Sequence, residues 1–222
     1  MRAAPAHEQV GDTERVRRPD LSALGHLRIR KAEPRDAPEI AALHVRGWEE
    51  FRAFVPEPVM QARNLSAREH EWSAILASAG SRMSVTVAEI DGVVGGFVHC
   101  KLLDEPVRSA QSEITRFFVA AGLRRQGVGR RLLAAAASWI RDRDAEPISL
   151  YSFTQNRFRA VYAKLGGREA GERPSVWDGI VIPETCYVWE TADDLIGVCS
   201  ANSDRWTAGQ AFRGDREQPG GV

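Results

Sequence analysis

The sequence has little of what marks secreted and membrane proteins. Its 222 residues include only three cysteines, which are far apart and odd in number. That scarcity excludes a disulfide scaffold and leaves no metal-binding pattern. No apolar run is long enough to span a membrane, and the first residues lack the apolar stretch of a signal peptide. We therefore expect reduced thiols, a cytoplasmic location and no bound metal.

A surplus of charge is also absent. The chain carries 30 lysines and arginines against 30 aspartates and glutamates, so nothing favours a nucleic acid or a membrane surface as its partner. The hydrophobic content of 43% and the charged content of 27% are ordinary for one globular domain. A site for an anion would have to come from a local cluster of residues.

The two ends of the chain differ from its middle. Residues 1–26 are polar and rich in arginine, and the C-terminal segment finishes in FRGDREQPGGV. Neither stretch offers enough apolar surface to offset the entropy lost on ordering. We expect disordered tails over residues 1–26 and 192–222, and one domain over residues 27–191.

The first half of this domain is predicted to form a strand, two helices and a hairpin. Residues 27–33 alternate as a strand does, and SARE at 66–69 has the pattern of a capping box that opens a helix to about residue 79. Two further strands flank Asp91 and Gly92, a pair typical of a type I′ hairpin turn. The first helix, over 34–54, has one apolar face formed by Ile40, Leu43, His44, Gly47, Trp48 and Phe51.

The second half centres on LRRQGVGRR, residues 123–131. A predicted strand over 113–119 precedes it and an apolar stripe of helical period follows it. Gly127 and Gly129 thus fall at a helix start, where unpaired N–H groups and the helix dipole favour an anion such as phosphate. Their missing Cβ atoms would let the ligand approach the backbone. The stripe comprises Val128, Leu132, Leu133, Ala136 and Ile140, and the neighbouring cations are Arg124, Arg125, Arg130 and Arg131.

Two common nucleotide motifs do not fit this stretch. A Walker loop needs Gly-Lys-Ser/Thr where the chain has Gly-Arg-Arg, and the dinucleotide fingerprint needs a third glycine where the chain has leucine. Residues 124–129, Arg-Arg-Gln-Gly-Val-Gly, instead resemble motif A of the GCN5-related N-acetyltransferases, with Phe117-Phe118-Val119 as the preceding strand end. ISLYSF at 148–153 and TQNRFRAVYAKLGG at 154–167 resemble the motif B region of the same family. With the upstream order of elements, the resemblance covers residues 27–191.

The resemblance implies both a fold and a co-substrate. The fold is an α/β domain with a mixed, mostly antiparallel sheet of six or seven strands and four helices. Acetyl-CoA would lie between two parallel strands that splay apart, with its pyrophosphate on the helix amides. The implied cofactor-binding residues are Phe117, Val119, Arg124, Arg125, Gln126, Gly127, Val128, Gly129, Arg130 and Asn156.

The resemblance also implies direct transfer of an acetyl group to a primary amine of a small molecule or a protein. Glu113 occupies the position of the general base in histone-acetylating members, and the Val119 N–H would polarise the thioester carbonyl. Tyr162 would protonate the departing sulfur. From the residues alone, Tyr162 can equally be a core tyrosine, Glu113 a solvated edge carboxylate, and Asn156 a helix cap.

The acceptor is not identified by the sequence. The segment 104–111 is expected to be a loop, whose Asp104 and Glu105 would favour a cationic acceptor if they lined the site. His44 and Trp48 fit either an acceptor pocket or a helix core, whereas we expect Trp72 in the core. A non-catalytic acyl-CoA-binding or regulatory module stays open, as do a homodimer and the use of the arginines for a nucleic-acid or protein partner.

Overall fold

The computed structural model describes residues 26–78 and 80–201, which form one seven-stranded sheet in the order β1-β2-β3-β4-β5-β7-β6. Neighbouring strands are antiparallel except β4 and β5, which run parallel. The predicted mixed, mostly antiparallel sheet is therefore confirmed. The strands are β1 (Leu27–Lys31), β2 (Met83–Ile90), β3 (Val93–Val107), β4 (Ala110–Val119), β5 (Ile148–Phe153), β6 (Arg168–Trp177) and β7 (Ile180–Trp189).

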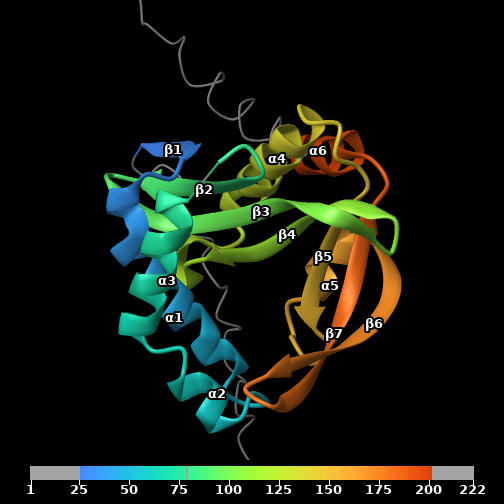
Figure 1. The fold of residues 1–222 in the computed structure, drawn as a ribbon. Coiled ribbons are helices and arrows are strands. Elements are labelled where there is room, and N and C mark those ends of the chain that lie inside the picture. Colours follow the sequence, from blue (N-terminus) through green and yellow to red (C-terminus); the bar gives the residue numbers. More distant parts are fainter. Residues whose placement is uncertain (1–25, 79, 202–222) are drawn as a thin grey trace, which may run out of the picture.

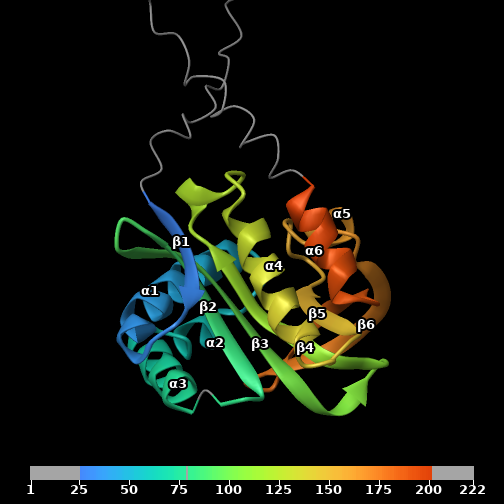
Figure 2. The same ribbon diagram turned by 90° about the horizontal axis from the view of Figure 1, so that it is seen from above.

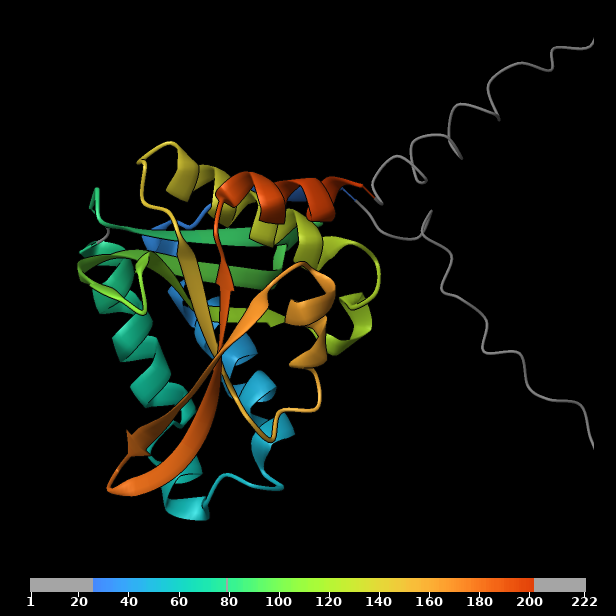
Figure 3. The same ribbon diagram turned by 90° about the vertical axis from the view of Figure 1, so that its right-hand side faces the viewer.

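Six α-helices accompany the sheet in the described residues, two more than predicted. α4 and α6 lie together on one face, and α1, α2 and α3 lie on the other (Figure 1 and Figure 2). α5 lies beside the loop that leads into α4 (Figure 3), where the Arg124 guanidinium is 4.9 Å from the centre of the Phe158 ring. The helices are α1 (Ala37–Trp48), α2 (Glu57–Gln61), α3 (Leu65–Ala77), α4 (Val128–Arg141), α5 (Ala160–Lys164) and α6 (Ala192–Ser200).

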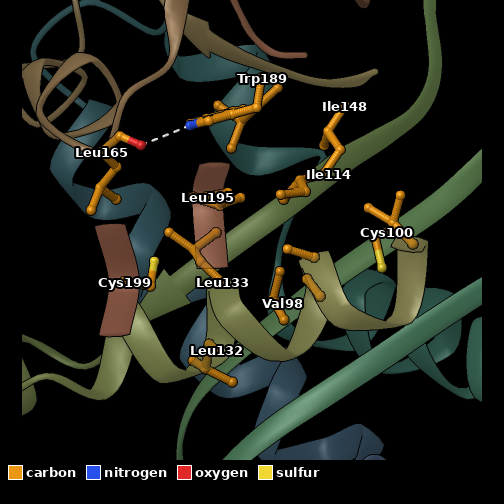
Figure 4. Close-up of a cluster of buried hydrophobic side chains, with 14 of the residues drawn as sticks. Val98, Cys100, Ile114, Leu132, Leu133, Ile148, Leu165, Trp189, Leu195 and Cys199 are labelled. Carbon is orange, nitrogen blue, oxygen red and sulfur yellow. Dashed lines mark hydrogen bonds between the residues drawn. The ribbon is translucent and has the colours of Figure 1, made fainter. Parts of the chain in front are cut away.

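The core on the α4 side is built on the stripe predicted for that helix. All five stripe residues are buried, and they pack against Ile114 of β4 and Ile148 of β5 (Figure 4). At one end of this cluster the Trp189 indole N–H donates to the Leu165 carbonyl at 2.8 Å (Figure 4). A buried indole N–H needs an acceptor, and this bond supplies one. It also links β7 to the end of α5.

The core on the opposite face comes from α1 and α3. Ile40 and Leu43 of α1 pack with Trp72 of α3 against β2 and β3, and Trp72 is fully buried, as predicted. A separate cluster joins the C-terminal end of α1 to β5 through Trp48 and Phe153. The sheet is therefore covered on both faces, and α1 reaches from one core into the other.

The C-terminal tail prediction is wrong for residues 192–200, which form α6. Thr191 begins this helix with a reciprocal capping box, in which its side chain accepts from the Asp194 N–H and Asp194 accepts from the Thr191 N–H. Leu195 and Cys199 are buried against α4. The remainder of the predicted tails, residues 1–25 and 202–222, lies outside the described residues.

We expect α6 to contribute to the stability of the domain. Leu195 is 0% exposed, so Leu195→Ala should lower the free energy of unfolding by about 2–5 kcal/mol. Ile196 is only partly buried on the same helix, so Ile196→Ala should cost clearly less. Urea unfolding of both variants tests this expectation. Equal and small losses would mean that α6 is not part of the cooperative core.

Residues typical of turns and helix caps predicted correctly which elements form, but they placed the ends of those elements less accurately. Asp91 and Gly92 have φ values of 49° and 83°, as a type I′ turn requires. The helix predicted from the capping box begins instead at its neighbour: Asn64 is the cap, and its side chain accepts from the Ala67 N–H at 3.0 Å. Ser66 lies inside α3, so its predicted role as the cap is wrong.

Two other segments also differ from expectation. The predicted loop at 104–111 is the tip of a long hairpin, because β3 continues to Val107 and β4 begins at Ala110. The helix predicted within 154–167 is confined to α5, and Phe158 and Val161 are 40% and 41% exposed. Only Tyr162 and Leu165 of its predicted apolar face are buried.

Candidate active site

The parallel ladder between β4 and β5 is short. It pairs Ser112–Ile114 with Ile148–Leu150 and ends there, so the two strands separate beyond these residues, as the resemblance implied. A cavity of about 600 Å³ lies at this separation, lined by β4, β5, α1, α3 and the β6–β7 hairpin. Its volume is in the range of small-molecule sites.

A β-bulge in β4 lies directly at the point of separation. The register with β3 shifts so that Ile114 opposes Cys100 and Arg116 opposes His99. Thr115 is left as the extra residue, which makes this a β-bulge. Bulges redirect side chains locally, and this one changes which residues of β4 face the cavity.

The bulge reverses the alternation of side chains along β4. Before it, the even-numbered Ile114 belongs to the α4 cluster, whereas after it the odd-numbered Phe117 and Val119 pack against that cluster. Glu113 and Phe118 therefore share the opposite face, and both line the cavity. The bulge thus brings a carboxylate and an aromatic ring to the same side of one strand.

The end of β4 also presents backbone groups that are not paired with β3. Ala120 donates its N–H to the Gly95 carbonyl at 2.9 Å. Because hydrogen-bonded and non-hydrogen-bonded pairs alternate in an antiparallel ladder, the N–H and C=O groups of Phe117 and Val119 point away from β3. They face the side from which β5 has departed, and Arg124 Nε donates to the Val119 carbonyl there at 3.0 Å.

The glycine turn forms the start of α4. Gly127 is the N-cap with φ 80°, it is exposed, and no side chain caps this end. A Cβ atom on Gly127 would meet nothing within 4 Å, whereas one on Gly129 would lie 3.0 Å from the Phe117 ring. Gly127 therefore leaves open space at the helix start, while Gly129 lets α4 pack closely on β4. Gln126 donates to the Gly122 carbonyl at 2.7 Å, which closes the turn.

The arginines of the turn have different surroundings. Arg124 forms two hydrogen bonds to the Glu50 carboxylate, one of them at 3.0 Å, so its guanidinium braces the turn against the segment that follows α1. Arg130 donates to the Val198 carbonyl at 2.5 Å and so contacts α6. Arg125 is exposed and its side chain has no partner among the described residues. These contacts argue against the Arg124 side chain as a phosphate ligand and leave Arg125 available for that role.

Tyr162 lies on the cavity wall at α5. Its residue is 8% exposed, its ring centre is 5.3 Å from that of Tyr187, and its hydroxyl has no hydrogen-bond partner in the described part of the chain. Burial, with a smaller contribution from Tyr187, raises the pKa of Tyr162 above its ordinary value. The phenol therefore stays protonated at neutral pH and lies where it can donate that proton into the cavity.

Asn156 lines the cavity but does not cap α5, whose N-cap is Arg159. Its amide oxygen accepts from the Phe158 N–H at 3.0 Å, the pattern of an Asx turn, and its amide nitrogen donates to the Ser152 hydroxyl at 3.0 Å. Both contacts anchor the turn that follows β5. The interpretation of Asn156 as a helix cap is therefore wrong.

Among the carboxylates of the cavity wall, Glu113 has the weakest ion pair. Its partner is Lys101, the residue opposite it on β3, at 3.8 Å, and the Glu113 side chain is 15% exposed. The other three are each held by arginine at 2.9 Å or closer: Glu71 by Arg68 and Arg116, Asp178 by Arg63, and Glu184 by Arg173. A carboxylate in strong ion pairs is a weak proton acceptor, so Glu113 is the best placed base of the four.

His44 also lines the cavity, as does Trp48. The indole N–H groups of Trp48 and Trp72 lie 3.1 Å from the two ring nitrogens of His44. A neutral imidazole accepts at one nitrogen only, so one indole donates at a time. Burial, followed by nearby guanidiniums of which Arg68 is the first, holds the pKa of His44 well below its ordinary value. His44 is thus a core residue and a poor base.

Several wall residues were not predicted from the sequence. Arg68 and Glu71 sit within one turn of the buried Trp72 on α3, and charges on the buried face of a helix were the available signal. Asp104 and Glu105, in contrast, are exposed and do not line the cavity. The residues missed are Arg63, Arg68, Glu71, Lys101, Arg116, Arg173, Asp178 and Glu184.

Two further findings concern the described residues. No helix there is long and apolar enough to cross a membrane. No group of three or more His, Cys, Asp or Glu side chains there is arranged to hold a metal ion. The cysteines Cys100, Cys186 and Cys199 are buried and not paired with one another.

Solved structures share this fold at low sequence identity. The PaiA N-acetyltransferase of Thermoplasma acidophilum, in complex with coenzyme A, is 15% identical over 72% of this chain and 98% of that chain, with a TM-score of 0.53. A ribosomal-protein-alanine N-acetyltransferase from Brucella melitensis is 22% identical over 73% and 99%, with a TM-score of 0.56. A Salmonella typhimurium protein with its cofactor acetyl-CoA is 17% identical over 75% and 94%, also at 0.56.

A match to a family model, and not to an individual protein, identifies the family of this chain. No curated protein matches the chain. The model of the Acetyltransferase (GNAT) family matches residues 40–167, a span that runs from α1 through the glycine turn and α5. Since this span is more than half of the 222 residues, the chain belongs to the GNAT acetyltransferase family.

Proposed function

We propose that the protein is an acetyl-CoA-dependent N-acetyltransferase that acetylates a primary amine held in the cavity. One observation carries the proposal: Glu113 of β4 and Tyr162 of α5 line the same cavity, at the point where β4 and β5 separate. A proton acceptor and a proton donor thus border one cavity. This is the arrangement that acyl transfer to an amine needs.

The residues around the split fit the proposed co-substrate. The exposed αL turn at Gly127, without a side-chain cap, leaves helix N–H groups and open space for a pyrophosphate. The outward N–H groups of Phe117 and Val119 and the outward C=O group of Phe117 suit the amides of a pantetheine arm. Gln126, Val128, Gly129, Arg130 and Asn156 support this site by shaping the turn and its surroundings, with Arg125 as the available cation and Arg124 as a brace.

Acetyl-CoA supplies the acetyl group as an activated thioester. In the proposed reaction, the amine nitrogen forms a bond to the acetyl carbon and the carbon–sulfur bond breaks. Glu113 accepts the proton that the amine loses, and Tyr162 gives a proton to the sulfur as it leaves. The Val119 N–H donates to the acetyl oxygen, where negative charge increases during the transfer. Phe118 and the other aromatic side chains of the wall exclude water.

The proposal is tested by the release of thiol from acetyl-CoA in the presence of a panel of primary amines. We expect amine-dependent release together with formation of the N-acetyl product, seen by mass spectrometry. Binding of acetyl-CoA without turnover over a broad panel would favour a non-catalytic acyl-CoA-binding module. Absence of acetyl-CoA binding would contradict the proposal altogether.

Substitution at the glycine turn tests the cofactor site. Gly127 has φ 80°, so we choose Gly127→Asn, because asparagine tolerates this conformation better than other residues. Its side chain would occupy the space left for the anion, so the affinity for acetyl-CoA should fall about tenfold or more, as for lost hydrogen bonds to a charged group. Calorimetry measures this affinity directly.

Gly92 provides a matched control for this variant. It has φ 83°, nothing lies within 4 Å of its Cβ position, and it is in the β2–β3 turn, which does not line the cavity. Gly92→Asn should therefore carry a similar backbone cost and leave the affinity unchanged. Equal affinities for acetyl-CoA in both variants would mean that the pyrophosphate does not bind at the start of α4.

A further inference from the structure

Three charged side chains and a neutral histidine form a group on the cavity wall built by α3, β3 and β4. It consists of Arg68, Glu71, His99 and Arg116, which we call the arginine cluster, and all four line the cavity. Glu71 accepts from Arg68 at 2.5 Å and also from Arg116. Two guanidiniums therefore share a single carboxylate.

The cluster has one positive charge more than its surroundings neutralise. Arg68 is 7% exposed in its side chain and Arg116 is 25% exposed, so solvent screens them little. A buried charge without a counter-ion is costly, and a bound anion would remove that cost. The other cations of the cavity each have a carboxylate of their own: Arg63 has Asp178, Lys101 has Glu113, and Arg173 has Glu184.

The cluster also presents hydrogen-bond donors that lack acceptors. Arg68 Nε and His99 Nε2 are buried and have no partner in the described part of the chain. The Thr115 hydroxyl lies 2.7 Å and Arg116 Nη1 lies 3.3 Å from His99 Nδ1. Because a guanidinium only donates and a hydroxyl can also donate, both contacts are satisfied when Nδ1 accepts and the proton of the neutral imidazole is on Nε2. Burial, followed by the charges of Arg116 and Lys101, lowers the pKa of His99 to about 4, which keeps the ring neutral.

Aromatic rings hold both guanidiniums in place. Arg68 lies 5.1 Å from the ring centre of Trp48, and Arg116 lies 5.3 Å from that of Trp72. Cation–π contacts of this kind orient a guanidinium without neutralising its charge. The donors are therefore arranged before a ligand arrives, which lowers the entropy cost of binding one.

We propose that the acceptor amine also carries a carboxylate, and that the arginine cluster binds this carboxylate. The inference rests on the proposed function and names the substrate class of the same cavity: amino acids and similar small amino carboxylates. A carboxylate supplies the missing negative charge and accepts from two or more N–H groups at once. The aromatic wall of Trp48, Phe51 and Phe153 suits an apolar body between the two polar groups.

The test compares amines that differ only in the carboxylate. Phenylalanine and leucine are assayed beside their decarboxylated counterparts, phenethylamine and isoamylamine, with acetyl-CoA. We expect kcat/KM to be about 10- to 100-fold higher for each amino acid, as for a hydrogen bond to a charged group. In Arg116→Met this ratio should fall close to 1, and Arg116→Lys, which keeps the charge but not the fork, should be intermediate.

Two controls separate recognition from damage to the fold. Arg168 pairs with Glu190 on the surface, and neither lines the cavity. Arg168→Met therefore removes one positive charge without changing the ratio. If Arg116→Met does not fold, the kcat/KM ratio of Arg116→Lys still tests whether Arg116 binds the carboxylate. An unchanged ratio in a folded Arg116→Lys protein would contradict the assignment.

The outcomes distinguish this inference from the proposed function. Equal or better acetylation of the decarboxylated amines by the parent protein would overturn the inference and leave the N-acetyltransferase proposal intact. If no amine is acetylated, the proposed function fails. Calorimetry of phenylalanine with the protein in the presence of coenzyme A then tests the cluster directly, and binding by the parent but not by Arg116→Met would still support a carboxylate site.

Discussion

Tyr162→Phe should lower kcat by about 10²- to 10⁴-fold, the contribution typical of a positioned general acid. Burial raises the pKa of Tyr162, so the parent enzyme retains its proton donor at neutral pH, and the variant has none. The ring stays packed, and the lost hydroxyl has no hydrogen-bond partner among the residues the structure describes, so the melting temperature and the affinity for acetyl-CoA should change little. Steady-state kinetics and calorimetry measure the three quantities.

Tyr187→Phe serves as the matched control. Tyr187 is fully buried beside Tyr162, but its hydroxyl is bound to Arg159 at 2.9 Å and to Glu169 at 3.0 Å. Its loss should lower stability by about 1 kcal/mol and leave kcat nearly unchanged. Similar kcat values for Tyr162→Phe and the parent would mean that Tyr162 is an ordinary packing residue of the core and not the acid.

Glu113→Gln should depress the rate most strongly at low pH, by about 10²- to 10⁴-fold. The substitution keeps the shape of the side chain and removes its basicity. At low pH almost every amine is protonated and needs a base, whereas at high pH the neutral amine reacts without one. The activity of the variant should therefore approach that of the parent as the pH rises, and a pH–rate profile of kcat/KM shows whether it does.

Glu184→Gln is the corresponding control. Glu184 is also a buried carboxylate of the cavity wall, but Arg173 holds it at 2.9 Å. Any defect that it causes should be structural, and so should reduce activity by a similar factor at each pH. If the profile of Glu113→Gln runs parallel to that of the parent, Glu113 is not the base and water takes over this role.

The sequence predicted best those features that depend on neighbouring residues. The stripe of α4 and the turn at Gly127 were predicted because helical period and helix-start chemistry act over a few residues. The hairpin at Asp91 and Gly92 was predicted for the same reason, because two adjacent residues determine its turn type. The cap of α3 was misplaced by two residues, since Asn64 and Ser66 are both good cap residues and only packing decides between them.

Features that depend on contacts between distant segments could not be predicted. α6 contains two aspartates and a glycine within nine residues, and it packs against α4, which lies some fifty residues earlier in the chain. The arginine cluster joins three elements, and no local pattern reveals that Arg68 and Arg116 share Glu71. Sequence reasoning therefore named most of the residues proposed to bind the cofactor and missed most of those proposed to bind the acceptor.

At the Thr115 bulge, the even- and odd-numbered side chains of β4 exchange faces of the sheet. Ahead of it the even positions lie under α4, and after it the odd positions do. A deletion of Thr115 would restore a continuous alternation in which Ile114, Phe117 and Val119 still share one face. The strand thus consists of two segments of opposite parity, and both contribute side chains to the cavity. Removing Thr115 would therefore change the bend of β4 beside the cavity, whereas removing a residue elsewhere in the strand would turn one of the two segments to the opposite face.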